Sequence, residues 1–279
     1  MSNSKKQMNL EIDIEQIMRN KNPRLARFIP RPVFRWIKRI IRQDEINDVL
    51  RKYGHLEGTA FIQAVLDEWG YKPNVIAQGN IDPSKKYIFA SNHPLGGLDG
   101  LILANEIEKR YGAVKVMVND LLMHLTPIKS LFVGVNKYGK QTIQYARELD
   151  QMYSSDVQVL LFPAGLCSRR INFKVQDLEW KKNVIAKAVQ YQRDIIPILF
   201  DATNTRYFYR FASIRKALGI KMNIELLLLP GEMFRQSNKH MNIYFGEPIP
   251  YTTFTREKRP EEWAAWLREQ VYALKTTQE

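Results

Sequence analysis

A histidine and an aspartate flank a glycine-rich bend in residues 91–100, which read SNHPLGGLDG. A histidine whose ring is oriented by a carboxylate can take a proton from a hydroxyl group near neutral pH, so His93 and Asp99 could form a general base. The bend follows an apolar run at residues 86–90 that predicts a buried strand, and it precedes a predicted helix from Leu101. His93 is therefore expected at the carboxyl end of a strand, where open α/β sheets bind ligands.

A second segment, residues 160–170, reads LLFPAGLCSRR and ends a predicted strand in a Pro and Gly turn. Two adjacent arginines, Arg169 and Arg170, follow this turn. Arginine side chains suit phosphate or carboxylate recognition, although a solvated pair of charges would give the same pattern. Two shorter segments, 133–137 and 195–198, predict apolar strands, the first ending in a cation and the second interrupted by a proline.

An alternation of strands and helices after residue 70 predicts an α/β fold with a layered sheet. The first 70 residues contain no convincing strand, so we divide the chain into a helical N-terminal region, residues 1–70, and an α/β domain, residues 71–279. Helical patterns cover residues 142–153 and 180–192. Strand-like runs cover residues 87–91, 114–119, 133–136, 157–162, 195–200, 224–229 and 241–245.

Composition and charge limit the classes of function. The chain has 279 residues, one cysteine and a formal net charge of +13, with a pI near 9.7. Because Cys167 is single, no internal disulfide can form, and a free cysteine is more often a small buried apolar residue than a nucleophile. The charge favours an acidic partner, which is nucleic acid, an anionic lipid surface or an acidic carrier. No nucleic-acid reading motif is evident, so we expect no nucleic-acid partner.

The stretch from Lys21 to Arg42 is basic and amphipathic, since it contains eight Lys or Arg residues and no Asp or Glu. A helix that starts at Pro32 sets an apolar stripe beside a cationic one. Such a helix can lie in the headgroup region of an anionic membrane. An ordinary surface helix that packs its stripe on the core explains the same pattern, and both interpretations can hold together. The predicted membrane contacts are Arg35, Trp36, Lys38 and Arg39.

No apolar run approaches the roughly 18 to 20 residues that a helix needs to span a bilayer. Residues 1–13 are polar and lack the apolar centre of a secretory signal. We therefore expect a cytoplasmic protein without a transmembrane helix or signal peptide, peripheral on the inner face of the membrane.

The order of these segments resembles the glycerolipid acyltransferase superfamily, which includes the PlsC-like lysophosphatidic acid acyltransferases. That family carries a His and an Asp separated by four residues, a basic strand-end block, a Phe-Pro-Glu-Gly-Thr-Arg-Ser block and an apolar block centred on Pro. The matching blocks here are His93 with Asp99, residues 135–137, residues 162–169 and residues 196–198.

Two departures bear on the acyl acceptor. Five residues, rather than four, separate His93 from Asp99, and Ala164 stands where the family has Glu. With these departures, the His-Asp segment and the Phe-Pro-Ala-Gly-Leu segment look most like the branch that O-acylates lyso-aminolipids, such as lyso-ornithine or lyso-glycine lipid. The glycine pair inside the first segment can absorb the extra residue by adopting dihedrals that other residues avoid.

The resemblance implies an O-acyltransferase that moves a fatty acyl group from acyl-ACP (acyl carrier protein) or acyl-CoA to the hydroxyl of a lyso-lipid. It implies a mostly parallel mixed sheet flanked by helices, with no cofactor beyond the thioester and no metal. His93 would be the base and Asp99 would fix its tautomer, while backbone amides of the glycines could stabilise the tetrahedral oxyanion. The implied substrate-binding residues are Asn92, Gly96, Gly97, Lys137, Pro163, Gly165, Ser168, Arg169 and Arg170.

Other functions stay open at this point. One is a 1-acylglycerol-3-phosphate acyltransferase of phospholipid synthesis that tolerates Ala164. The others are a thioester hydrolase and a non-catalytic lipid-binding protein of the same fold. Product analysis separates these classes, because a transferase consumes thioester only when a lyso-lipid is supplied.

Overall fold

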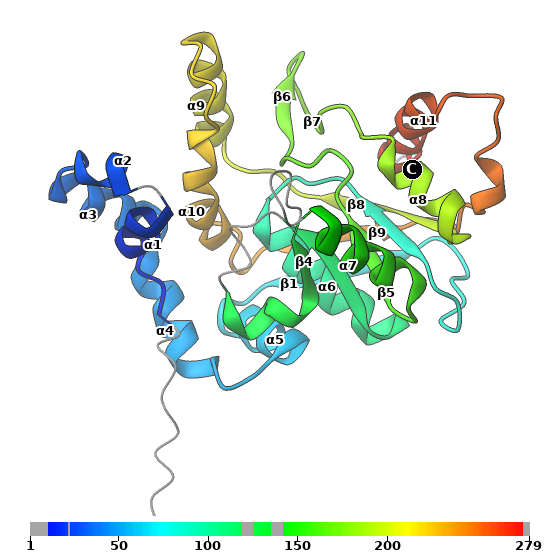
Figure 1. Cartoon of the computed structure of the whole chain (residues 1–279), viewed down its shortest axis with the longest axis horizontal. Helices are drawn as coiled ribbons and strands as arrows, with labels where there is room; N and C mark the ends of the chain where they lie inside the picture. The colour runs from blue at the N-terminus through cyan, green and yellow to red at the C-terminus, as the bar shows by residue number, and fades with distance from the viewer. Residues whose placement is uncertain (1–10, 22, 119–124, 135–141, 276–279) are drawn as a thin grey trace, which may run out of the picture.

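The computed structural model describes residues 11–21, 23–118, 125–134 and 142–275 (Figure 1). Within these residues, seven strands form one sheet in the order β1-β9-β8-β2-β5-β3-β4. The five strands from β8 to β4 are parallel, while β9 runs antiparallel to β8 and β1 runs parallel to β9. The strands are β1 (Lys72–Ala77), β2 (Ile88–Ser91), β3 (Val114–Val118), β4 (Phe132–Gly134), β5 (Gln158–Leu161), β8 (Ile195–Asp201) and β9 (His240–Phe245).

The central strands are buried on both faces, as expected for parallel strands with near-continuous apolar runs. Alternate residues of β2 point to opposite sides: Phe89 joins the core on one face, and Ile88 and Ala90 join the core on the other. Helices α5 (Gly58–Glu68) and α6 (Gly97–Tyr111) pack on the first face. Helices α7 (Thr142–Ser154), α8 (Asn183–Tyr191) and α11 (Pro260–Ala273) pack on the second. The prediction of a mostly parallel mixed sheet flanked by helices is therefore confirmed.

Among the described residues before α5, the helices are α1 (Ile14–Lys21), α2 (Pro23–Arg27), α3 (Arg31–Ile40) and α4 (Gln43–Tyr53). They confirm the helical N-terminal region. Residues of α4 and α5 belong to the same core as the sheet, so residues on both sides of position 70 contribute to one apolar cluster. The division into two units at residue 70 stays a prediction.

The amphipathic helix α3 is buried on only part of its apolar surface. Phe34 and Ile37 are buried, whereas Val33 and Trp36 are exposed. Both interpretations of this helix therefore have a structural counterpart: one apolar row packs on the protein and a neighbouring row faces outward. In the described part of the chain, no helix is both long and apolar enough to cross a membrane.

A helical arm projects from the sheet (Figure 1). It consists of α9 (Arg206–Ala217), the 3-10 helix η3 (Ile224–Leu228) and α10 (Leu229–Phe234). The strand predicted at residues 224–229 is therefore wrong. The run is rich in leucine rather than β-branched residues, and Pro230 near the start of α10 favours a helix there. Two further 3-10 helices are η2 (Thr126–Leu131) and η4 (Tyr251–Thr253).

Two elements have no counterpart among the predicted strands. The edge strand β1 contains Pro73, which cannot donate to a ladder and which weakens a strand prediction. The arginines after the turn at residues 162–165 form a hairpin, β6 (Arg169–Ile171) with β7 (Lys174–Gln176), rather than a loop. Its turn residues Asn172 and Phe173 both have positive φ, as a two-residue type I′ turn requires, but Phe is an unusual residue for that conformation.

Candidate active site

His93 follows β2 and faces Asp99 across the predicted bend. The Nδ1 atom of His93 lies 3.0 Å from Oδ1 of Asp99. The N–H direction is not aligned for a hydrogen bond, and Nδ1 has no other partner in the described structure. Catalytic contacts of this kind are often poorly aligned without substrate and tighten when substrate is bound. The pair therefore has the distance that base catalysis needs.

Two backbone N–H groups hold the Asp99 side chain in place. Its Oδ2 accepts the N–H of Leu95 at 2.9 Å and its Oδ1 accepts the N–H of Gly100 at 2.8 Å. The residue lies in the first turn of α6, where the helix dipole also favours a negative charge. Gly96 makes the bend possible, because it has a φ of 78° and an added Cβ would lie 2.7 Å from Cδ1 of Leu229. Gly96 therefore has the kind of backbone conformation expected of a glycine in this bend.

The imidazole of His93 is mostly enclosed but reaches solvent. Its side chain is 19% exposed, and its ring packs against Phe162 with centroids 4.2 Å apart. Burial lowers the pKa of His93, but the Asp99 carboxylate and the charge of Asp177 more than offset this, so the pKa is raised above that of an ordinary histidine. Since Nδ1 faces Asp99, Nε2 is the nitrogen that can meet a substrate hydroxyl.

Asp177 is a buried carboxylate that the sequence analysis missed. Its Oδ1 accepts the backbone N–H of His93 at 3.1 Å and the hydroxyl of Ser168 at 2.6 Å, and its Oδ2 accepts the indole N–H of Trp180 at 2.9 Å. Burial raises the pKa of Asp177, although these hydrogen bonds act in the opposite direction. The residue therefore ties the His93 turn to residues 168–180. A lone Asp after a short hairpin carries no sequence signal for this role.

Several predicted substrate-binding residues have framework contacts. Asn92 exchanges two hydrogen bonds with the backbone of Phe200, which fixes the end of β2 against β8. The backbone N–H of Ser168 donates to the carbonyl of His93 at 2.7 Å. These contacts hold the loops that surround His93, and any contact of Asn92 or Ser168 with substrate stays a prediction.

The turn at residues 162–165 is closed by a hydrogen bond from the N–H of Gly165 to the carbonyl of Phe162, and the carbonyl of Pro163 accepts the N–H of Lys181. Gly97 is the first residue of α6, a position where backbone N–H groups lack an intrahelical partner. Ala164 is buried in the core on the α8 face, away from solvent. The oxyanion roles of the glycines stay predictions, and Lys137 lies outside the described residues.

Arg169 and Arg170 point to different surroundings. Arg169 donates to the buried carboxylate of Glu225 at 2.9 Å, and Arg215 donates to the same carboxylate at 3.0 Å. Arg169 also lies 3.0 Å from the sulfur of Cys167, whose thiol has its pKa raised by burial. Arg170 is exposed and lies over the ring of Phe173. Substrate contact by either arginine stays a prediction.

The predicted membrane-contact residues lie on the outward side of the protein. Arg35, Trp36 and Arg39 are exposed, and Lys38 pairs with Asp13 at 3.3 Å. The described residues contain no group of three side chains that could hold a metal ion.

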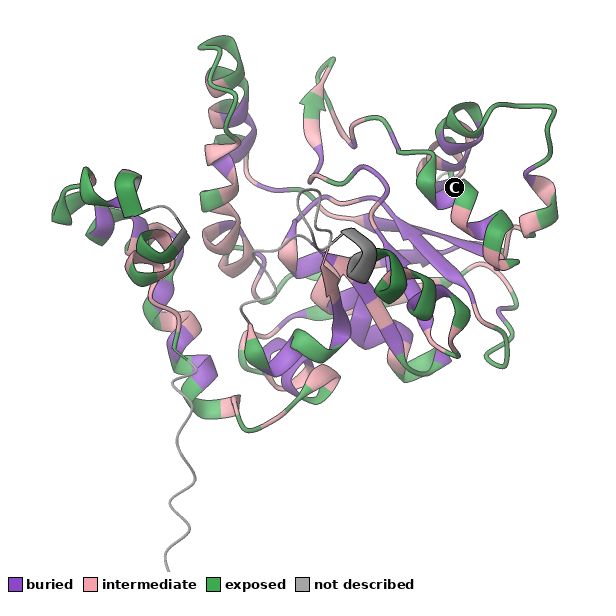
Figure 2. Ribbon diagram, in the orientation of Figure 1, coloured by how far each residue is buried: buried purple, intermediate pink, exposed green. Residues whose placement is uncertain are grey.

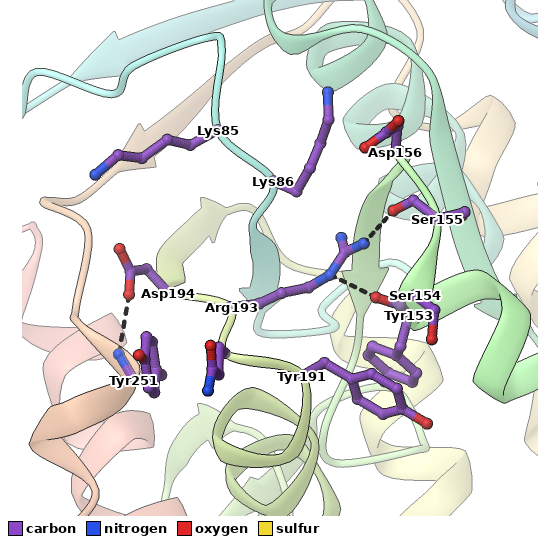
Figure 3. A pocket seen from close by; sticks show the side chains of 11 residues that line it. Lys85, Lys86, Tyr153, Ser154, Ser155, Asp156, Tyr191, Arg193, Asp194 and Tyr251 are labelled. Atoms are coloured by element: carbon purple, nitrogen blue, oxygen red, sulfur yellow. Dashed lines mark hydrogen bonds between the residues drawn. The ribbon is translucent and has the colours of Figure 1, made fainter.

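A depression of about 440 Å³ lies at the opposite edge of the sheet, where the parallel strands begin (Figure 3). Arg193, which lines it, donates to the carbonyls of Tyr153, Ser155 and Val157. Asp194 accepts the backbone N–H of Tyr251 at 3.0 Å. These polar groups are used within the protein, so the depression offers no counterpart to the His93 site.

Comparisons with known proteins identify relatives over almost the whole chain. The model of a family described as Acyltransferase matches residues 16–279. The chain is 42% identical over 264 residues to a lyso-glycine lipid O-acyltransferase of Bacteroides thetaiotaomicron, with 94% of this chain and 97% of that protein covered. It is 39% identical to a lyso-glycine lipid O-acyltransferase of Phocaeicola vulgatus, with 94% and 95% covered.

A comparison of structures gives a weaker likeness. The 1-acyl-sn-glycerophosphate (LPA) acyltransferase PlsC of Thermotoga maritima matches with a TM-score of 0.45 and 16% identity, covering 86% of this chain and 95% of that chain. A likeness at this level bears on neither substrate nor mechanism.

Proposed function

Since the chain belongs to the acyltransferase family and is an acyltransferase, we propose that it moves a fatty acyl group from an acyl thioester to the hydroxyl of a lyso-aminolipid, with lyso-glycine lipid as the first candidate. The observation that carries the choice of acceptor is the 42% identity to a lyso-glycine lipid O-acyltransferase across 94% of the chain. The His93 site supports the choice of chemistry.

In the proposed mechanism, the acceptor hydroxyl lies against Nε2 of His93 and its oxygen attacks the thioester carbonyl. His93 takes the hydroxyl proton as the new C–O bond forms, and Asp99 stabilises the resulting imidazolium. When the tetrahedral intermediate collapses, the C–S bond breaks and the imidazolium returns the proton to the departing thiolate. No acyl-enzyme forms, because the substrate hydroxyl takes the place of an enzyme nucleophile.

The acyl donor in this proposal is acyl-ACP or acyl-CoA. Both are acidic, and the net charge of +13 suits either one. The acceptor is presented by a membrane, and the protein acts as a peripheral protein on its inner, cytoplasmic face through α3 and its residues Arg35, Trp36, Lys38 and Arg39. A helix that exposes Trp beside several basic residues supports this contact.

The test is analysis of the lipid products by mass spectrometry. The purified protein is supplied with acyl-ACP or acyl-CoA and, in separate reactions, with lyso-glycine lipid, lyso-ornithine lipid and 1-acylglycerol 3-phosphate. We expect diacylated aminolipid, and no product from the His93→Ala variant. Phosphatidic acid as the sole product would move the protein to phospholipid synthesis. Thioester loss without an acceptor would identify a hydrolase, and absence of any turnover would favour a lipid-binding protein.

A further inference from the structure

The last turn of α9 and the residues between α9 and η3 carry large apolar side chains that face solvent. Ile214, Leu218 and Met222 are 58%, 69% and 67% exposed. The neighbouring Ile220 is also exposed. We call residues 214–222 the arm tip. Figure 2 shows the far end of the arm as largely exposed, well away from the sheet. Such a group of exposed apolar residues at one end of a projecting element marks an interaction surface.

The solvent-exposed charged side chains of the arm are all positive. Arg206, Arg210, Lys216 and Lys221 are exposed. The only acidic residue from position 206 to 228 is Glu225, which is buried and bound by two arginines. The outer surface of the arm is therefore apolar at its end and cationic along its length, and it is complementary to an anionic surface with an apolar interior.

Internal hydrogen bonds hold the arm tip in this shape. Arg215 donates to the carbonyl of Ile220 at 2.7 Å and to the carboxylate of Glu225, so its guanidinium joins α9, the turn and η3. Gly219 has a φ of 70° and ends α9 with a sharp turn. The apolar side chains are therefore held outward before any partner arrives, which lowers the ordering cost of binding.

The arm contacts two elements that also carry exposed apolar and basic residues. Helix α3 contacts η3, and α9 contacts β6. At the end of the β6–β7 hairpin, Phe173 is 89% exposed, and Arg170 and Lys174 beside it are exposed as well. The exposed Trp36 lies on α3. The arm tip, the end of the β6–β7 hairpin and α3 therefore each expose an aromatic or aliphatic side chain close to basic ones.

The arm is in direct contact with the bend between His93 and Asp99, which we call the catalytic bend. Asn204, which precedes α9, donates to the carbonyl of Pro94 at 2.9 Å. Leu229 of α10 packs against Gly96, and Arg169 links β6 to η3 through Glu225. These contacts join the arm to the residues around His93, so a lipid surface bound by the arm would lie on an element that touches the His93 site.

We propose that the arm tip, with Phe173 and the outer face of α3, docks on an anionic bilayer and places the catalytic bend at the surface that supplies the lyso-lipid. The inference rests on the proposed function for the identity of the substrate, and it adds two docking segments that are distant in sequence from α3. An acidic carrier protein accounts less well for the surface, because its attraction to basic residues does not require the exposed apolar side chains at 214, 218 and 222.

The first experiment removes the apolar side chains of the arm tip. The triple variant Ile214→Ser, Leu218→Ser, Met222→Ser is compared with Val189→Ser, which changes an exposed apolar residue of α8. Binding to vesicles that contain an anionic phospholipid is measured by co-sedimentation. We expect the triple variant to bind about tenfold or more weakly, with unfolding temperature maintained, and Val189→Ser to bind like the parent.

The second experiment removes charge. Lys216→Gln with Lys221→Gln is compared with Lys72→Gln and Lys85→Gln, which removes two exposed charges outside the docking segments. The first pair is expected to weaken binding to anionic vesicles about tenfold and the second pair much less. Equal binding by the parent, the triple variant and both charge pairs would overturn the docking proposal.

Turnover separates this proposal from the proposed function. For each variant, acyl transfer to lyso-lipid in vesicles is divided by transfer to a short-chain acceptor that stays monomeric in solution. A lower ratio for the arm-tip variants supports docking. A raised KM for acyl-ACP with unchanged vesicle binding would assign the surface to the carrier and overturn docking. If the parent shows no transfer to either acceptor but the variants still lose vesicle binding, the proposed function fails and docking stands.

Discussion

Buried polar side chains are paired differently at the amino ends of the parallel strands, called the amino edge here, and at their carboxyl ends, called the carboxyl edge. At the edge where the parallel strands begin, Arg193 donates to three backbone carbonyls, and Gln158 bonds to three backbone groups, those of Tyr87, Lys85 and Tyr111. At the edge where they end, His93 has a misaligned contact with Asp99 and a raised pKa. Polar groups that are fully paired stabilise a fold, whereas groups with perturbed pKa values and incomplete pairing mark sites of chemistry.

Because of this difference, we propose the site at His93 rather than in the depression of Figure 3. Arg193, the buried cation beside this depression, already donates to three backbone carbonyls. The carboxyl edge carries a partly exposed imidazole, that of His93, 3.0 Å from the buried carboxyl group of Asp99. We therefore expect substitutions at the carboxyl edge to change catalysis and substitutions at the amino edge to change stability.

Removal of the base should have the largest effect. We expect His93→Ala to reduce acyl transfer on the order of a thousandfold or more, because no other group would accept the hydroxyl proton. Asp99→Asn should also lose most activity, since the wrong imidazole tautomer would face the substrate. Unfolding temperature should change little for His93→Ala, because its backbone contacts remain. His55→Ala, which removes an exposed imidazole, is the control, and full turnover by His93→Ala would rule out this mechanism.

Arg193 provides the matching test at the amino edge. Arg193→Ala leaves three carbonyls without their donor in a buried setting, which should cost roughly 3 kcal/mol of unfolding free energy in urea denaturation. The kcat of the folded fraction should stay within about twofold of the parent. Arg256→Ala, which removes an exposed guanidinium, should change neither quantity. If Arg193→Ala showed a large fall in kcat with an unchanged unfolding free energy, the proposed division between a catalytic carboxyl edge and a stabilising amino edge would be wrong.

At the carboxyl edge, the sequence predicted the contacts between residues that lie in one short segment. His93 and Asp99 lie within one bend, and the apolar run before them identified a strand end, so spacing alone suggested their contact. The central strands were also readable, because strands buried on both faces need continuous apolar sequence.

Residues that act through tertiary contacts left no comparable pattern. Asp177 is 84 positions from His93, and nothing in its neighbours indicates a hydrogen bond to the His93 backbone. Glu225 lies in a leucine-rich run that looked like a strand, and only the fold shows that it binds Arg169 and Arg215. Sequence reasoning therefore predicted that His93 and Asp99 lie together, but it did not find the buried charges around them.

Asp177 should affect the pH dependence of the reaction. The base must be neutral to act, so kcat/KM falls as pH drops through the pKa of His93, which is raised above that of an ordinary histidine. Because the charge of Asp177 helps to raise it, Asp177→Asn should move this acid limb to lower pH and reduce kcat about tenfold through a less firmly held turn. Asp156→Asn removes an exposed carboxylate at the amino edge and should leave the limb in place. A limb that does not move in Asp177→Asn, with only a loss of stability, would make Asp177 purely structural.

Substitution of Arg169 should have the smallest effect on acyl transfer. It tests whether the substrate-binding site extends from His93 to this arginine. If its guanidinium serves only to neutralise Glu225, then Arg169→Ala lowers stability and leaves KM unchanged, because Arg215 still pairs with the carboxylate. If it also meets the acceptor or the donor, KM for that substrate should rise about three- to tenfold while unfolding free energy falls less. We expect the second result, since Arg169 keeps part of its surface exposed beside the His93 loops and two arginines on one carboxylate leave a net positive charge. Arg170→Ala is the control for loss of a nearby exposed charge, and an equal KM change in both variants would assign the effect to long-range attraction instead of contact.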